Sequence, residues 1–241
     1  MSAGQEARPP DPAAVAAVAR TWDGRAARYE RHYQAYSEAG RGAWRGLYRE
    51  AVDALLGSAR RPLRILDVGT GTGFSAVLLA ELGHEVTGMD ASGQMLARAR
   101  TEAARRGVAV RWRHGDGHDP GGTRYDLVTC RYVLWTLPAP AAALTTWAAA
   151  LRPGGAVLVA DGLWHTARQL LCRPRLLSGA IRDYLGMGRT LPYWRGMTAG
   201  QAAPLLRSAG FGPPRRFEHL LPTEVHRDSR DFFVLGAVRD G

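Results

Sequence analysis

The chain has 241 residues, 46% of them apolar, which is sufficient for one large domain with a full-sized core. No apolar stretch approaches the roughly 20 residues of a membrane span, and Met1 to Pro12 lacks the apolar centre of a secretory signal, so we expect a cytoplasmic protein. The two cysteines, Cys130 and Cys172, give neither a disulfide framework nor a metal-ligand spacing, so we expect no metal.

The formal net charge of +10 raises nucleic acid as a possible partner. All 32 basic residues are arginine, however, and they are scattered in isolated pairs such as Arg60-Arg61, Arg105-Arg106 and Arg215-Arg216. A lysine-free composition is also what coding drift in a GC-rich genome produces, and dispersed charge is typical of solvated surface. The pattern therefore favours a small-molecule partner over nucleic acid, and we expect a monomer or a homodimer.

Two helices are predicted ahead of the first strand. Residues 1–12 are polar and contain three prolines, so we expect a disordered leader there. Apolar residues then recur at three- and four-residue spacing over residues 13–36 and 41–56, which predicts helices. We expect residues 13–57 to form a helical cap on a single domain that spans residues 13–241.

After Pro62, short apolar strands alternate with longer helical stretches, which is typical of βαβ units and a parallel sheet. The first five strands are expected at residues 63–68, 85–89, 109–113, 125–131 and 156–160. The helices between them are expected at residues 74–81, 92–106 and 140–151. Residues 162–199 break the alternation and predict an insertion that forms a lid over the site. The last elements are expected to be a helix at residues 201–209 and strands at residues 215–221 and 232–238.

The sequence thus predicts an α/β fold, a Rossmann-like, doubly wound and mostly parallel seven-stranded sheet. Right-handed crossovers place the carboxyl ends of parallel strands along one edge, where open α/β sheets bind ligands. We expect the functional site on that edge.

The most informative segment is Ile65 to Phe74, which predicts a buried strand, a glycine turn and a helix. Glycines in such a turn let a ligand approach the backbone, and the helix amides behind them offer donors. The spacing is G-x-G-x-G at Gly69, Gly71 and Gly73, and differs from the dinucleotide pattern G-x-G-x-x-G. Asp67 precedes the first glycine by two positions, and a carboxylate at a strand tip suits a cationic group such as the amino group of an amino acid.

Two further acids follow strands. Asp90 ends the second strand about 20 residues past the glycine turn, the distance at which an acid reaches both ribose hydroxyls. Asp116 lies between Gly115 and Gly117 after the third strand, where its side chain can accept a hydrogen bond from an adenine amino group. Each has a purely structural alternative, because Asp90 is also placed to cap the helix from Ser92 and Asp116 to hold a turn.

Together these segments resemble the class I S-adenosylmethionine-dependent methyltransferases over roughly residues 60–161. Segments resembling the family's motifs occur in the family's order: Leu66 to Gly73, Gly88 to Asp90, Gly115 to Gly117, Tyr125 to Cys130 and Leu151 to Gly155. The segment Arg131 to Pro138 is similar to the loop after strand four in methyltransferases of ubiquinone and menaquinone biosynthesis and in their natural-product relatives. The amide-methylating motif that other members carry after strand four is absent, since Cys130-Arg131-Tyr132-Val133 stands there.

The resemblance implies S-adenosylmethionine as the cofactor and a small molecule as the acceptor, in secondary metabolism. It places the methionine portion beside Asp67 and the glycines, the ribose at Asp90, the adenine at Gly115 to Gly117, and Arg131 beside the cofactor. The full set of expected cofactor residues is Asp67, Gly69, Thr70, Gly71, Gly73, Asp90, Ala91, Met95, Gly115, Asp116, Gly117 and Arg131.

Methyl transfer from a sulfonium is an in-line displacement in which alignment of the acceptor supplies much of the acceleration. A base is needed only where the acceptor must lose a proton early, and His165 and Tyr29 are the candidates. His165 also fits a solvated bystander. Aromatic residues gather outside the predicted sheet and predict an apolar lid that contacts the acceptor and the sulfonium, or else ordinary helix packing. The candidate acceptor residues are Trp22, Tyr33, Trp135, Trp164, Tyr184, Tyr193 and Trp194.

Three alternatives remain. An RNA methyltransferase shares the cofactor core and requires a basic track to the pocket. A non-methylating member of the same fold would hold the cofactor without turnover. An NAD-dependent oxidoreductase is disfavoured by Asp67 and by the shortened glycine spacing.

Overall fold

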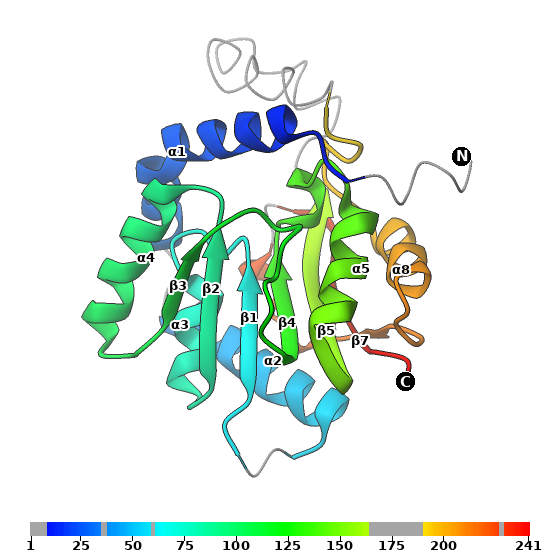
Figure 1. The fold of residues 1–241 in the computed structure, drawn as a ribbon. Coiled ribbons are helices and arrows are strands. Elements are labelled where there is room, and N and C mark those ends of the chain that lie inside the picture. The colour runs from blue at the N-terminus through cyan, green and yellow to red at the C-terminus, as the bar shows by residue number, and fades with distance from the viewer. Residues whose placement is uncertain (1–8, 35–37, 59–60, 164–189, 227–228) are drawn as a thin grey trace.

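The computed structural model describes residues 9–34, 38–58, 61–163, 190–226 and 229–241. Seven strands form one sheet in the order β3-β2-β1-β4-β5-β7-β6 (Figure 1). They are β1 (Arg64–Val68), β2 (Glu85–Asp90), β3 (Arg111–His114), β4 (Tyr125–Arg131), β5 (Leu151–Leu163), β6 (Arg215–Arg216) and β7 (Arg230–Val238). The first five are parallel, and β7 runs antiparallel to β5 and β6. The predicted seven-stranded, mostly parallel, Rossmann-like sheet is confirmed.

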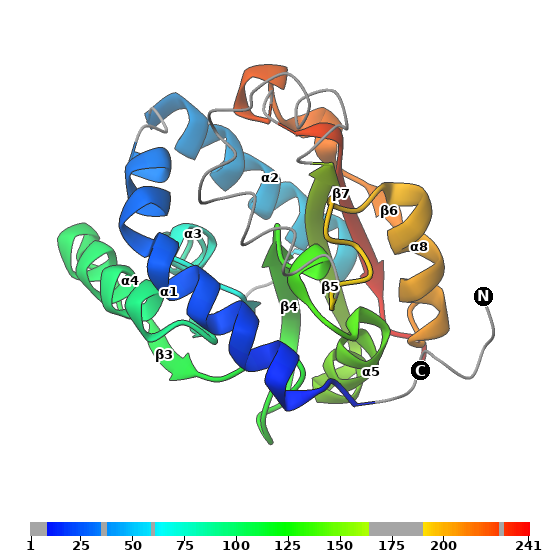
Figure 2. The same ribbon diagram turned by 90° about the horizontal axis from the view of Figure 1, so that it is seen from above.

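Helices cover both faces of this sheet. α2 (Glu38–Leu56) and α3 (Phe74–Glu81) pack with one apolar cluster, and α5 (Pro140–Ala150) and α8 (Ala199–Ser208) with the other. α4 (Gly93–Arg106) lies beside β2 and β3. α1 (Pro12–Gln34) crosses above the carboxyl ends of the strands and packs on α4 (Figures 1 and 2). The described part of the chain contains no helix that is long and apolar enough to cross a membrane.

Burial on both faces explains the composition of the central strands. In β1, Ile65 to Val68 are at most 1% exposed, and every residue of β4 is buried. A parallel strand covered by helices on both sides reads as a continuous apolar run, and not as an alternating one. Polar residues therefore stand out in these strands, and Asp67 is the only one within β1 after Arg64.

Three predicted boundaries were wrong. α1 already begins at Pro12, because proline fits the first turn and the Asp11 side chain accepts a 2.9 Å hydrogen bond from the Ala13 amide. β5 starts at Leu151, which pairs with Tyr125 before an irregularity in the ladder. The strand expected at residues 215–221 ends after Arg216, and the 3-10 helix η3 (Glu218–Leu220) follows. There the Glu218 carboxylate accepts from the Val234 amide, so a side chain takes the place of the backbone in the ladder.

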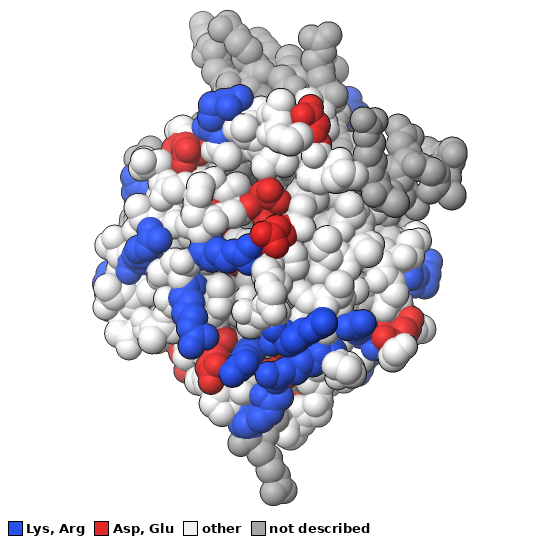
Figure 3. All heavy atoms as spheres, viewed as in Figure 1, with Lys and Arg blue, Asp and Glu red and all other residues white. Residues whose placement is uncertain are grey.

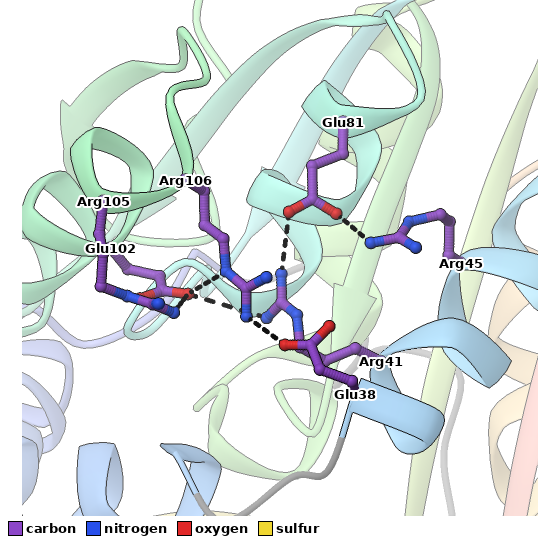
Figure 4. Close-up of polar contacts among 7 residues, drawn as sticks. All are labelled: Glu38, Arg41, Arg45, Glu81, Glu102, Arg105 and Arg106. Atoms are coloured by element: carbon purple, nitrogen blue, oxygen red, sulfur yellow. Dashed lines mark hydrogen bonds and ion pairs between the residues drawn. The ribbon is translucent and has the colours of Figure 1, made fainter.

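A cluster of ion pairs joins α2 to α3 and α4 (Figure 4). Arg41, whose side chain is 6% exposed, lies 3.2 Å from Glu81, and Arg45 bonds to the other oxygen of the same carboxylate. Arg106 bridges Glu38 at 2.9 Å and Glu102 at 3.1 Å. The start of α2 is thereby fixed to the two helices that follow β1 and β2.

Candidate active site

A pocket opens at the carboxyl edge of the sheet, over β1, β2 and β4. The strand order reverses between β1 and β4, which is the position where open α/β sheets bind ligands. The pocket encloses about 580 Å³, including the space at its open mouth, a size suited to a nucleoside-like ligand. It is lined by Trp22, Tyr29, Val68, Gly69, Gly71, Asp90, Ala91, Met95, Gly115, Gly117, Arg131, Tyr132, Val133, Thr136 and Leu137.

A second, smaller and polar pocket adjoins the first, with which it shares Tyr29, Gly69 and Arg131. Its other lining residues are Asp67, Thr70, Thr72, Phe74 and Ser75, at the end of β1 and the start of α3. Backbone amides at the start of a helix attract negative charge. The two pockets together therefore join an apolar chamber to a subsite that holds both a carboxylate and anion-binding amides.

Asp67 is 1% exposed and accepts a 2.6 Å hydrogen bond from the Thr70 hydroxyl. Burial raises the pKa of Asp67 to about 7, although the Thr70 bond, the Arg131 guanidinium and the Ala76 amide each lower it. A cation placed beside this carboxylate would favour its ionised form. Asp67 is thus prepared to receive positive charge.

The glycine turn brings backbone into both pockets. Gly69 and Gly71 have φ angles of +61° and +56°, in the left-handed region that favours glycine. A Cβ on Gly69 would lie 2.4 Å from Val133 Cγ2, so this glycine also lets the loop after β4 approach. Gly73 differs, because it lies outside the pocket and packs against Ala99 and Trp112.

Asp90 lies at the tip of β2 and lines the main pocket. Its two carboxylate oxygens accept 2.8 Å hydrogen bonds from the Gly71 and Ser92 amides. Burial raises the pKa of Asp90 to about 6, while these two bonds lower it. The Ser92 bond fits the structural alternative, and the exposure of Asp90 to the pocket fits the functional one, since each oxygen keeps a lone pair for a ligand.

The third acid is oriented differently. Gly115 and Gly117 line the pocket, whereas the Asp116 carboxylate accepts a 2.7 Å hydrogen bond from the His118 amide and lies 3.1 Å from the His118 ring. The loop is held from behind by Trp147, whose indole donates to the Gly117 carbonyl at 2.6 Å. Asp116 thus holds its own turn, and the adenine-side wall consists of glycine backbone.

Arg131 is buried among aromatic rings at the end of β4. Its guanidinium carbon lies 4.4 Å from the Phe74 ring centre, 5.3 Å from Trp44 and 5.2 Å from Tyr132. Such rings stabilise a cation that has left water. Arg131 therefore contributes a fixed positive charge to both pockets.

The aromatic residues fall into two groups. Trp22 and Tyr29, on α1, line the main pocket with their rings 5.6 Å apart in an edge-to-face arrangement, and Trp135 lies 6.1 Å from Trp22. Trp194 packs with Trp22 in a small apolar cluster around Val18 and Leu191. Tyr193 packs instead against the core on the α5 and α8 side.

Several predicted residues lie outside the described part of the chain, namely Trp164, His165, Tyr184 and the side chain of Tyr33. Among the described residues there is no group of three or more metal-ligating side chains.

Sequence reasoning missed two kinds of site residue. The first is the run after β4, where Tyr132, Val133, Thr136 and Leu137 line the pocket. Their apolar character gave no signal, because core residues have the same composition. The second is Asp161, an acid that ends β5 and is 0% exposed. An acid at the end of an apolar strand was the signal that found Asp67 and Asp90, and it was available for Asp161 too.

Residues 65–155 match a family described as a methyltransferase domain. The chain is 35% identical over 99 residues to the ubiquinone biosynthesis O-methyltransferase of Aeromonas salmonicida (strain A449), covering 40% of this chain and 42% of that protein. It is 32% identical over 158 residues to the tRNA 5-carboxymethoxyuridine methyltransferase of Escherichia coli (strain K12), covering 61% of this chain and 59% of that protein. The fold matches magnesium protoporphyrin IX methyltransferase from Synechocystis PCC 6803 with bound S-adenosylhomocysteine, with a TM-score of 0.60, 20% identity, and 88% and 93% of the two chains covered.

The chain is a class I S-adenosylmethionine-dependent methyltransferase. It spans 42% and 59% of the lengths of the two curated methyltransferases named above. These two relatives carry different printed acceptors, so membership of the family leaves the acceptor open.

Proposed function

We propose that this methyltransferase binds S-adenosylmethionine across the two joined pockets and transfers its methyl group to a small molecule. One observation carries the proposal. Asp67, Asp90 and the bare backbone of Gly69 and Gly71 come from separate segments and meet at the reversal of strand order between β1 and β4.

The main pocket fits the adenosyl portion. Asp90 offers acceptors to the ribose hydroxyls while it also holds the Gly71 and Ser92 amides. Ala91 and Met95 lie beside it, and Gly115 and Gly117 form a wall without side chains against which a flat base can lie. The absence of Cβ atoms on this wall is what a closely packed adenine requires.

The polar pocket fits the amino acid portion. Asp67 receives the ammonium group, and Arg131 with the amides at the start of α3 receives the carboxylate. Thr70 holds Asp67 in place through its 2.6 Å hydrogen bond. The sulfonium then falls between the two pockets, close to Gly69 and Tyr29, which line both.

When bound, the sulfonium supplies an electrophilic methyl group, and the carbon–sulfur bond breaks as the bond to the acceptor forms, leaving S-adenosylhomocysteine. Trp22 and Tyr29 cover this position from α1 and exclude water. Their rings also stabilise positive charge near the reacting carbon. Tyr29 and His165 remain candidate bases for an acceptor that must lose a proton.

The acceptor belongs to the small molecules of biosynthetic pathways, including natural-product pathways. The aromatic wall of Trp22, Tyr29 and Tyr132 supports this class, because flat or apolar acceptors pack on rings. The test is turnover of the full chain with methyl-labelled S-adenosylmethionine and a panel of phenols, quinols, amines and carboxylic acids. Release of S-adenosylhomocysteine with label in one acceptor supports the proposal. Cofactor binding without release across the whole panel would favour a non-methylating role.

Transfer to RNA is the second candidate, and similarity to the Escherichia coli tRNA methyltransferase supports it. The arrangement of charge supports it less. Arg61, Arg64 and Arg152 surround Asp126 at the amino ends of β1, β4 and β5, so this basic cluster lies at the edge opposite the pocket. Figure 3 shows the arginines gathered along that lower edge. Retention of tRNA at low salt that weakens steeply as salt rises would favour this candidate.

A further inference from the structure

We propose that Asp161 is a positioning residue that sets the shape of the cofactor pocket by holding the first turn of η1 (Leu134–Thr136). This inference rests on the proposed function, because the pocket it shapes is the cofactor pocket. Asp161 itself lies outside the pocket lining and acts through the loop after β4.

The first step is the position of η1. Three side chains in and beside this turn each contact a different wall of the pocket. Val133 packs on the Gly69 turn, Leu137 packs on Gly117, and the Trp135 ring contacts Trp22 of α1. A shift of η1 would therefore move the methionine side, the adenine side and the covering helix together.

The second step is how η1 begins. Within the turn, the Thr136 and Leu137 amides bond to the carbonyls of Val133 and Leu134. The first amides of a helix have no partner inside it and need an external acceptor. Asp161 supplies one, since hydrogen bonds from the backbone amides of Gly162, Trp135 and Leu134 all reach its carboxyl and lower its pKa. The Gly162 bond is 2.8 Å long.

The third step is the cost of this acid. Asp161 is 0% exposed, its Oδ2 has no hydrogen-bond partner, and burial raises its pKa to about 8. A carboxyl that is half satisfied in the core destabilises the fold relative to a neutral side chain. Such groups persist where they serve the site. Holding η1 is the service that the geometry supports.

The experiment titrates S-adenosylhomocysteine by calorimetry into the full chain and three variants. Asp161→Ala removes the acceptor, Asp161→Asn keeps one oxygen acceptor, and Val157→Ala makes a cavity on the same face of β5, about 13 Å further from η1. We expect Asp161→Ala to raise the Kd about tenfold or more, Asp161→Asn to stay within about threefold of the parent, and Val157→Ala to leave the Kd unchanged.

Parent-like affinity in folded Asp161→Ala would overturn the proposal. So would Asp161→Asn that binds as weakly as Asp161→Ala, because the effect would then come from the charge. Equal weakening by Val157→Ala would reduce Asp161 to a general core residue. If Asp161→Ala does not fold, Asp161→Val takes its place, since it keeps the volume and removes the acceptor.

A second measurement does not need the cofactor. Hydrogen exchange of the ligand-free protein should show faster exchange of the Thr136 and Leu137 amides in Asp161→Ala than in Asp161→Asn. If the parent binds no S-adenosylhomocysteine, the proposed function fails while this measurement still tests the role of Asp161. Unchanged exchange at these two amides would overturn the positioning role alone.

Discussion

The hydroxyl of Ser92 donates a 2.6 Å hydrogen bond to the carboxylate of Asp23, which ties α1 to the start of α4. The same Asp23 oxygen accepts from the Gln94 amide at 3.2 Å. The residue before it, Trp22, lines the pocket. A carboxylate at a helix start on one side and a ring contact with Trp135 on the other therefore hold α1 across the pocket mouth.

Asp23→Ala should weaken S-adenosylhomocysteine binding by about three- to tenfold, the equivalent of roughly 0.7–1.4 kcal/mol for a lost helix-start contact. The change should appear mainly as faster dissociation in stopped-flow measurements, because α1 covers the ligand. Asp11→Ala is the matched control, since Asp11 caps α1 itself and has no contact with α4 in the described hydrogen bonds. Equal dissociation rates for parent and Asp23→Ala would contradict a closing role for this contact.

Asp90→Asn should weaken cofactor binding by about ten- to hundredfold, because bonds to a charged acceptor contribute roughly 1.5–3 kcal/mol. Calorimetry with S-adenosylmethionine measures this directly. Asp119→Asn removes a carboxylate from an exposed ion pair with Arg113 near the same edge of the sheet, and its affinity should equal that of the parent. Unchanged binding by Asp90→Asn would mean that Asp90 serves only the Gly71 and Ser92 amides.

The pH dependence of binding should follow Asp67. Its pKa is raised to about 7 by burial, and only its ionised form can receive an ammonium group. Affinity should therefore fall as pH drops below about 7, by up to tenfold per pH unit. Arg131 and Asp90 are the other charged groups that face Asp67. Asp67→Asn should bind weakly with a flat profile from pH 5.5 to 8, and a profile that keeps the parent's slope would assign the titration to another group.

The stability of the ligand-free protein should change with Asp67 in the opposite sense. A carboxyl whose folded pKa is above its unfolded value stabilises the fold fully below the unfolded pKa, and this contribution is lost as pH rises through the folded pKa. For Asp67 the window runs from 3.8 to about 7. The Tm of Asp67→Asn should exceed that of the parent at pH 8, and the difference should shrink toward pH 5. A lower Tm for the variant at pH 8 would be the contrary result.

Gly69→Ala should destabilise the protein by about 1–3 kcal/mol and weaken cofactor binding, because its Cβ would lie 2.4 Å from Val133 Cγ2. Gly83→Ala isolates the backbone effect, since Gly83 also has a positive φ, +86°, but faces open space. The double variant Gly69→Ala, Val133→Ala should recover part of the loss in urea unfolding. No recovery would place the cost in the backbone and not in the clash.

Much of this protein follows from local sequence. Continuous apolar runs predicted β1 and β4, glycine spacing predicted the turn at Gly69, and acids at the tips of strands identified Asp67 and Asp90 before their surroundings were known. These signals are local because strand burial and turn conformation depend on neighbouring residues. Resemblance to a known family then supplied the cofactor.

Only the tertiary structure decided which of these groups face one another. It turned Asp116 back to His118, placed Arg131 among the Phe74 and Trp44 rings, and brought Asp161 under η1 from a separate strand. Contacts between residues far apart in the chain depend on strand order and helix packing, which no local pattern encodes. The sequence determined the residues available for chemistry, and the fold decided which of them share a pocket.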